Sequence, residues 1–596
     1  MMFEIFLQGR TMKGTMRFAA ITTVIFAVIA SAAAQSDTAS AQAKVQGQTA
    51  SVTDEAQVGI CIRKVSGKVL TGDGAGKNFL PASNLKLVTC GTALESLGTD
   101  FRFQTEVAYS GKVGDDGVLY GDLHIVGGGD PTLGSSDPYA VPRDSLFARW
   151  TRAVRAAGIM SIAGSVVGDS RRMPGEVNGS WMYEDMATYY GATCSALMFN
   201  RNCLELSLRP GAAEGDPVNV GADAKVWREG SPGQASGNCP EDDSAAVLMP
   251  EQAPWMKIEN RCVTGPSGSG DRSYLFVSEF APAARLGGSF ALGKACKSVS
   301  YNNPFADFSC AYEFARHLAS EGIPCKAVTA TSSCHPTAVF NITHSHPTAI
   351  PAGARAVPSP DSPSCPNHTT ASGSETVFGF CTFDTCGSLT YSGHFAPQDS
   401  LTTITVTYSP RLSEIVRETL RVSDNLYAET LLRALTLSNP SDPHLSTDTE
   451  EALKFQAALL KDLGLNLSRT RLADGSGLSR KNSVSPSFMV SFLTAMSSRP
   501  CFSDFLGALN TPGPDEALLS TADAATRRRI RLKSGSMTGV RCYSGYILPE
   551  VSTPQVTSNS PRNGDITVFS IMINDATLPQ SKLREHIERL LRPYLE

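Results

Sequence analysis

Ser83 and Lys86 lie three residues apart and are residue types that can act as a nucleophile and its base. Apolar residues follow at helical spacing and end at Gly98, which predicts a helix over about 84–97 with Ser83 at its N-terminal edge. One helical turn would bring the Lys86 amine within reach of the Ser83 hydroxyl, a weak nucleophile without a base. Taken alone, S-x-x-K is a weak signal, because Ser83 could merely cap the helix and Lys86 could be a solvated surface lysine.

Two further short motifs follow and strengthen the case for chemistry. Ser423-Asp424-Asn425 lies at the break between two predicted helices, where a rigid scaffold can hold its side chains. Lys533-Ser534-Gly535 is the single K-[ST]-G of the chain and lies on a predicted strand, which we expect at the edge of a sheet. The order of the three motifs and their positions on regular elements argue against coincidence.

The elements that must position these motifs come from both ends of the chain. Periodicity predicts helices at about 412–420, 426–435, 449–463, 487–496 and 581–591, and consecutive strands at 530–535, 540–548 and 566–573. Helices followed by strands and a terminal helix favour an α+β fold, in which helices cover an antiparallel sheet.

The middle of the chain has a different character. Strands and turns are predicted over 101–126, and a helix over about 144–157. From about 217 to 397 Gly, Ser, Pro and Cys dominate, and a helix over 308–322 is the exception. We therefore expect a catalytic domain made of residues 50–100 and 398–596, with an insertion domain (101–216) and a cysteine-rich insertion region (217–397) between its two parts.

The first 34 residues resemble a secretory signal peptide. Three basic residues precede an apolar run over 18–30, and Ala32-Ala33-Ala34 offers a cleavage site near Ala34. The run is too short for a comfortable membrane span, so an uncleaved N-terminal anchor is the less favoured alternative. We expect an exported protein without a stable membrane span. Its net charge of −5 gives no electrostatic reason to bind nucleic acid.

The cysteine content agrees with export. All 15 cysteines follow Ala34, and 11 of them fall between Cys194 and Cys386. Disulfides are the expected state in an oxidising compartment, and the odd count leaves at least one thiol unpaired or intermolecular. A zinc site is the alternative, since four histidines lie near Cys334 and Cys365, but no C-x-x-C spacing occurs there and we expect no metal.

The three motifs together are typical of penicillin-binding proteins and class A β-lactamases. Their surroundings resemble the peptidase S13 family, which contains D-alanyl-D-alanine carboxypeptidases of the penicillin-binding protein 4 type that also act as endopeptidases. The resemblance covers about 55–220 and 400–596, and the segments that carry it are 79–83, 128–133, 189–192, 195–200, 423–429 and 474–479. It implies a transpeptidase-like catalytic domain interrupted by insertion domains.

The resemblance also implies how acylation would proceed. Ser83 would attack the carbonyl between the last two D-alanines of a peptide and form an acyl-enzyme. Lys86 would act as the base, with its pKa lowered by burial and by the neighbouring cation of Lys533. Ser423 would relay a proton to the departing amine, and Asn425 would hold the substrate amide or orient Lys86.

The same resemblance assigns the substrate-binding groups to the Lys533 strand. Lys533 and the Ser534 hydroxyl would bind the terminal carboxylate of the substrate, and Ser534 stands where threonine is commoner in the family. Gly535 completes the motif, and the backbone N–H groups of Ser83 and Ser536 are the candidate oxyanion donors. No metal or organic cofactor is required.

The expected partners are peptidoglycan stem peptides as substrate, in the periplasm, and β-lactams as covalent inhibitors. Two other functions compete with this hypothesis. A class A β-lactamase needs a positioned glutamate for deacylation, and no Glu-x-x-Leu-Asn-type segment supplies one. A non-catalytic wall-binding homologue should have lost the nucleophile, the base or the carboxylate binder, yet Ser83, Lys86 and Lys533 are all present.

Overall fold

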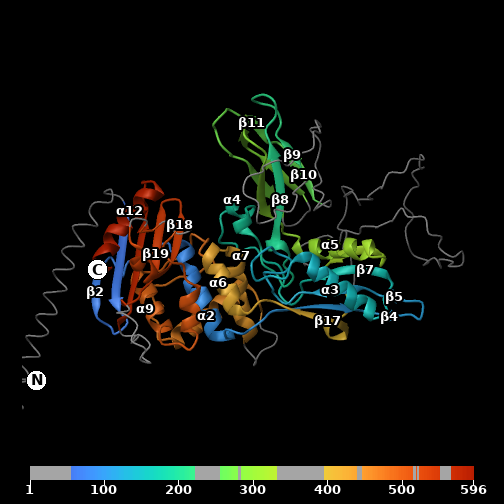
Figure 1. The fold of residues 1–596 in the computed structure, drawn as a ribbon, viewed down its shortest axis with the longest axis horizontal. Helices are drawn as coiled ribbons and strands as arrows, with labels where there is room; N and C mark the ends of the chain where they lie inside the picture. Colours follow the sequence, from blue (N-terminus) through green and yellow to red (C-terminus); the bar gives the residue numbers. More distant parts are fainter. Residues whose placement is uncertain are drawn as a thin grey trace, which may run out of the picture. The chain divides into compact units, whose positions relative to one another are not determined.

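The computed structural model describes residues 56–221, 256–278, 283–331, 395–438, 446–513, 518–519, 522–550 and 565–595. The chain divides into two compact units. The first unit contains the chain up to Phe101, Asn178–Met182 and the chain from Arg411 onward, and the second contains Arg102–Val177 and Tyr183–Pro410. Figure 1 traces both units along the sequence.

The first unit is built on a five-stranded antiparallel sheet. Its strands, in spatial order, are β18 (Ile530–Met537), β19 (Val540–Ile547), β20 (Thr567–Asn574), β1 (Gln57–Lys64) and β2 (Val69–Asp73). Strands from the two ends of the chain therefore lie side by side, as the blue and red arrows of Figure 1 show. Every residue of β20 is buried, because helices cover both faces of the sheet. β18 lies at the sheet edge, as predicted for the strand that carries Lys533.

Helices complete this unit. α12 (Gln580–Leu591) packs its apolar side chains against one face of the sheet, and α9 (Pro486–Met496) packs against β1 and β20. The helix that carries the first motif begins with a 3₁₀ turn, η1 (Ala82–Leu85), continues as α2 (Lys86–Leu97) and ends at Gly98. The others are α6 (Leu412–Val422), α7 (Asn425–Ala434), α8 (Thr449–Asp462), α10 (Phe502–Ala508) and α11 (Ala524–Arg528). The predicted α+β architecture is confirmed, and the predicted ends of the helices and strands in this part agree to within two residues.

The second unit contains a seven-stranded sheet. Six of its strands follow the order β17 (Thr402–Tyr408), β3 (Gln104–Tyr109), β6 (Leu123–Val126), β7 (Ser161–Asp169), β5 (Val118–Tyr120) and β4 (Lys112–Val113), and β16 (Cys325–Ala330) also pairs with β7. The helices α3 (Arg143–Ala156) and α5 (Ala306–Ser320) supply a buried aromatic core, in which Trp150 and Phe314 meet edge to face at 5.2 Å.

Smaller sheets complete this unit. One has the order β15 (Lys297–Asn302), β8 (Cys203–Arg209) and β9 (Asn219–Gly221), and another the order β10 (Lys257–Asn260), β13 (Ala283–Gly287) and β12 (Tyr274–Val277). A third pairs β11 (Val263–Gly265) with β14 (Ser289–Ala291), and the short helix α4 (Tyr183–Met186) precedes them in the chain. The expected boundary at 216/217 falls inside this unit, because β15 pairs with β8 and β16 pairs with β7 across it.

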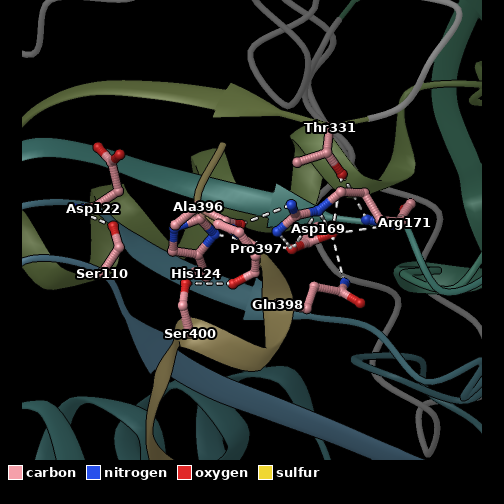
Figure 2. A network of polar contacts seen from close by, with 11 residues as sticks. Ser110, Asp122, His124, Asp169, Arg171, Thr331, Ala396, Pro397, Gln398 and Ser400 are labelled. Carbon is pink, nitrogen blue, oxygen red and sulfur yellow. Dashed lines mark hydrogen bonds and ion pairs between the residues drawn. The ribbon is translucent and has the colours of Figure 1, made fainter. Parts of the chain in front are cut away.

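A buried carboxylate at the end of β7 joins three segments of the second unit (Figure 2). Asp169 accepts hydrogen bonds from the Arg171 guanidinium at 2.6–3.1 Å, from Gln398 Nε2 at 3.0 Å and from Thr331 Oγ1 at 3.2 Å. Arg171 also donates to the Ala396 carbonyl at 2.8 Å. Burial acts to raise the pKa of Asp169, but the hydrogen bonds and the charge of Arg171 prevail and lower it below its ordinary value.

The cysteines that the structure describes differ from the expected disulfide framework. Buried thiols are found at Cys61, Cys90, Cys262, Cys310, Cys325, Cys501 and Cys542, whereas Cys296 is disulfide-bonded. The disulfide prediction is therefore wrong for these buried thiols, which pack as small apolar side chains. The segment with the four histidines, Cys334 and Cys365 lies outside the described residues, as does the predicted signal peptide. Within the described parts of the chain, no helix is long and apolar enough to cross a membrane.

Candidate active site

The first motif forms a hydrogen-bonded pair. Ser83 lies within the 3₁₀ turn η1, and Lys86 begins α2 one turn later. Lys86 is fully buried, and its Nζ donates to Ser83 Oγ at 2.9 Å. The residue before the serine, Ala82, has a φ of +46°, a strained conformation for a residue with a Cβ atom. The chain thus holds the serine hydroxyl at the entrance of a buried site that contains an amine.

The second motif forms the corner between α6 and α7. Asn425 Oδ1 accepts a hydrogen bond from Lys86 Nζ at 2.6 Å, so this asparagine orients the amine. Asp424 caps α7 by accepting from Tyr427 N at 2.9 Å, and Ser423 ends α6 with a left-handed φ of +63°. The Ser423 side chain is half-buried and makes no hydrogen bond to any residue that the structure describes.

A loop that the three motifs do not include provides the third acceptor for Lys86. Ser476 O accepts from Lys86 Nζ at 2.9 Å. The buried Glu429 of α7 holds this loop by accepting from the backbone N–H groups of Gly475 at 3.0 and 3.1 Å and Ser476 at 2.8 Å. Residues 423–429 and 474–479 carry part of the family resemblance, but no role was predicted for Glu429 or Ser476.

Asp474 fixes the other side of the same loop. Its carboxylate accepts from the backbone N–H groups of Gly477 at 2.9 Å and Ser479 at 2.5 Å, and from Trp181 Nε1 at 3.0 Å. Two buried carboxylates, Glu429 and Asp474, therefore shape the loop. Burial and the charge of Asp474 raise the pKa of Glu429 to about 7.

The electrostatics of the site favour a lysine that can lose its proton. Burial lowers the pKa of Lys86 to about 8, while the charges of Asp424, Asp474 and Glu429 act in the opposite direction. A lowering of this pKa by burial was predicted from the sequence. The expected contribution of Lys533 is not among these causes, and the neighbouring groups that raise the pKa of Lys86 are the three carboxylates and the Cys90 thiol.

The third motif lies on the edge strand β18 beside the serine. Asn84, which follows the nucleophile, donates from Nδ2 to Lys533 O at 2.9 Å and to Cys542 O at 3.2 Å, which ties η1 to the sheet. Lys533 is buried, and its Nζ donates to Ser534 O at 2.9 Å. A Cβ atom at Gly535 would lie 2.5 Å from Pro81 O and 3.2 Å from Ser83 N, so only glycine allows this close approach.

Ser534 and Ser536 differ in their exposure to solvent. Ser534 is half-buried, whereas Ser536 is exposed and pairs across the sheet with Arg541. Because Gly535 is adjacent to Ser536 and lies against Ser83 N, the first and third motifs are brought together at the edge strand.

A sheet whose edge strand lies against a serine–lysine pair defines the class of serine acyl-transfer enzymes to which penicillin-binding proteins belong. Within that class, the chain belongs to the D-Ala-D-Ala carboxypeptidase 3 (S13) family, whose family model matches residues 41–253 and 393–593. The family predicted from the motifs is therefore confirmed.

Individual relatives agree with this assignment. The chain is 26% identical over 514 residues to a D-alanyl-D-alanine carboxypeptidase of Actinomadura sp., an alignment that covers 82% of this chain and 74% of the relative. It is 28% identical over 193 residues to penicillin-sensitive carboxypeptidase A of Dictyostelium discoideum, an alignment that covers 31% of this chain and 34% of that relative.

Penicillin-binding protein 4 (dacB) of Haemophilus influenzae shares the fold, with a TM-score of 0.65 and 17% identity. This structural match covers 93% of this chain and 99% of the other. The predicted penicillin-binding fold with additional domains is confirmed by this likeness.

Proposed function

We propose that this protein is a serine-type D-Ala-D-Ala carboxypeptidase that trims peptidoglycan stem peptides through an acyl-enzyme on Ser83. The observation that carries the proposal is the 2.9 Å contact between Ser83 Oγ and the buried Lys86, whose pKa is about 8. A lysine near that value is neutral often enough at working pH to accept a proton. Cleavage of peptide cross-links, a D,D-endopeptidase activity, uses the same chemistry and is included in the proposal.

Acylation would begin with neutral Lys86. Its Nζ would take the proton of the Ser83 hydroxyl while Oγ attacks the carbonyl carbon between the last two D-alanines. The ammonium formed on Lys86 would then donate to Asn425 Oδ1 and Ser476 O, the two acceptors it contacts at 2.6 and 2.9 Å. The Ser423 hydroxyl would relay the proton held by Lys86 to the D-alanine amine as its C–N bond breaks, and water would then hydrolyse the Ser83 ester and release the shortened peptide.

Groups on and beside β18 would hold the substrate. The cation of Lys533 and the Ser534 hydroxyl would bind the terminal carboxylate, and the backbone N–H groups of Ser83 and Ser536 would donate to the oxyanion. The close approach of Gly535 to Ser83 N supports this arrangement, because it brings the Ser83 N–H group near the residue that directly precedes Ser536. We further propose that the protein acts in the periplasm after cleavage of its signal peptide near Ala34.

A β-lactamase would use the same acylation groups but needs a carboxylate that activates water. Glu429 is buried near Lys86, yet both of its oxygens accept backbone N–H groups of the loop at Gly475 and Ser476. A carboxylate occupied in this way is poorly suited to activate water, so the penicilloyl ester should persist. The peptidase is therefore the favoured function.

Labelled penicillin and D-alanyl-D-alanine pentapeptide provide the test. We expect penicillin to attach to the peptide that contains Ser83, and mass spectrometry to detect release of D-alanine much faster than penicillin turnover. Lys86→Ala should slow acylation on the order of 10³-fold, whereas the matched change at the exposed Lys77, Lys77→Ala, should leave the rate unchanged. Rapid multiple turnover of penicillin with untouched pentapeptide would show that the protein is a β-lactamase instead.

A further inference from the structure

The small sheet β10-β13-β12 of the second unit exposes aromatic side chains on one face. Along the edge strand β12, Leu275 is buried, whereas its neighbours Tyr274 and Phe276 are 49% and 37% exposed. Alternation places both rings on the same face. Gly287 of β13 pairs with Tyr274, and a Cβ atom there would lie 2.7 Å from the tyrosine ring, so the absence of a side chain lets the ring lie on the strand.

A third ring extends this surface. Tyr183 of α4 is 64% exposed and stacks on Phe276, with ring centroids 5.6 Å apart and an interplanar angle of 22°. Phe276 in turn meets Tyr274 at 4.9 Å and 70°. We call Tyr183, Phe276 and Tyr274 the aromatic platform. Contiguous exposed apolar groups of this kind mark interaction sites more often than isolated exposed residues do.

Charged groups border the platform. Arg285 of β13 pairs with Phe276 across the sheet, and its Nε donates to Glu259 Oε2 at 2.8 Å. Arg261 donates to the other oxygen of Glu259 at 2.6 and 2.7 Å. These hydrogen bonds lower the pKa of the Glu259 carboxyl below its ordinary value. All three side chains are at least 36% exposed, and two cations beside one carboxylate leave an excess of positive charge.

We propose that the aromatic platform binds the glycan strand of peptidoglycan. A pyranose ring presents C–H groups on its face, which fit the electron-rich face of an aromatic ring. It also presents hydroxyl and amide groups at its rim, within reach of guanidinium and carboxylate partners. The excess positive charge suits a polymer that carries carboxylates, on the stem peptides of intact peptidoglycan and on the lactyl groups that become free when the stem peptides are removed.

This inference rests on the proposed function, because the glycan is the polymer that carries the stem peptides. Binding the glycan would raise the local concentration of stem peptides around the enzyme without taking part in the chemical step. The platform is therefore expected to matter for polymeric peptidoglycan and not for a soluble peptide.

The test uses the full chain and glycan strands freed of stem peptides by an amidase. We expect the unmodified protein to bind these strands, and the double variant Tyr183→Ser/Phe276→Ser to bind at least tenfold more weakly. Tyr183→Ser alone, which changes no residue of the sheet, should weaken binding in the same direction. Tyr408→Ser is the matched control, because Tyr408 is 54% exposed on β17 and lies in another sheet.

Two further readouts separate the platform from the active site. Penicillin labelling and hydrolysis of soluble pentapeptide should be equal in all variants, while release of D-alanine from intact sacculi should fall in the double variant. If penicillin fails to label Ser83 but glycan binding follows the expected pattern, the proposed function fails and the binding inference stands.

Absence of glycan binding by the unmodified protein, or equal binding by the double variant, would overturn the inference. Self-association that depends on the platform, seen by sedimentation without glycan binding, would also overturn it. That result would identify a second copy of the chain as the occupant.

Discussion

Replacing Asp424 by asparagine should move the pH dependence of acylation without removing the reaction. Among the neighbouring charges that raise the pKa of Lys86, the charge of Asp424 has the largest effect. Asparagine is about as good a helix cap as aspartate, so Asp424→Asn should keep the contact with Tyr427 N that begins α7. The change therefore removes a charge and keeps the local structure.

The expected shift follows from Coulomb's law. Asp424 directly precedes Asn425, which contacts Lys86 Nζ, and a unit charge at a separation on the order of 8 Å contributes about 0.5 kcal/mol in water and about 2 kcal/mol at an effective dielectric constant of about 20. One pH unit corresponds to about 1.4 kcal/mol. Losing the Asp424 carboxylate should therefore lower the pKa of Lys86 by about 0.4 to 1.5, from its starting value of about 8.

The sign of the effect on rate follows from the role of Lys86. Only the neutral amine can accept the Ser83 proton, so the rate of acylation by a labelled penicillin should rise as the pH passes through the pKa of Lys86. In Asp424→Asn this rise should occur at lower pH. Acylation rates measured from pH 5.5 to 10 would give both midpoints.

A matched control is Asp504→Asn, the same change at an exposed residue in the first turn of α10, which should leave the midpoint unchanged. A midpoint that stays in place or moves to higher pH in Asp424→Asn would refute the role of Lys86 as a base tuned by nearby carboxylates.

Two other changes have defined outcomes. Gly535→Ala should slow acylation by at least about 100-fold, because its Cβ atom would push β18 away from Pro81 O and Ser83 N. The control Gly76→Ala places its Cβ atom in open space and should leave the acylation rate unchanged. An unchanged rate in Gly535→Ala would contradict the close approach. Asp169→Asn should destabilise the protein by roughly 1.5–3 kcal/mol at neutral pH, because the charged acceptor of Arg171, Thr331 and Gln398 is lost. Since the pKa of Asp169 is lowered in the folded protein, its stabilising contribution is present above the unfolded pKa and is lost as pH falls through the folded value. The thermal unfolding temperatures of the two proteins should therefore converge in acid. A difference that stays constant with pH would count against this role of Asp169.

Spacing along the chain was enough to predict the contacts that depend on local geometry. Ser83 and Lys86 are one helical turn apart, which places the amine within reach of the hydroxyl, and the structure joins them by a 2.9 Å hydrogen bond. The helices and strands of the C-terminal part were predicted for the same reason, because each shows its own periodicity. The 3₁₀ start of the first helix was not predicted, since it depends on how the backbone of residues 81–84 packs against Gly535 and Gly477.

Contacts between distant segments could not be predicted in this way. Asn84 ties the nucleophile to β18 and β19 through the carbonyl oxygens of Lys533 and Cys542, which are 449 and 458 residues away, and Glu429 holds a loop 46 and 47 residues further on. Nothing in the residue types marks these partners, because they depend on which segments pack together. The disulfide prediction failed for a similar reason, since the spacing of cysteines in sequence does not reveal whether a thiol faces the core or another thiol.

The carboxylates around Lys86 tune its pKa, and only one of them, Asp424, belongs to a short motif, whereas Glu429 and Asp474 lie outside all three. Burial alone favours the neutral amine, and by itself it would make the ammonium formed during acylation costly. Asp424 at the cap of α7, Glu429 on α7 and Asp474 in the loop that Glu429 holds offset that cost, and together these effects leave the pKa at about 8. A general base works best when its pKa lies close to the working pH. Substitutions at these carboxylates should therefore change the pH at which the enzyme works, whereas substitutions at Ser83 or Lys86 remove the reacting groups themselves.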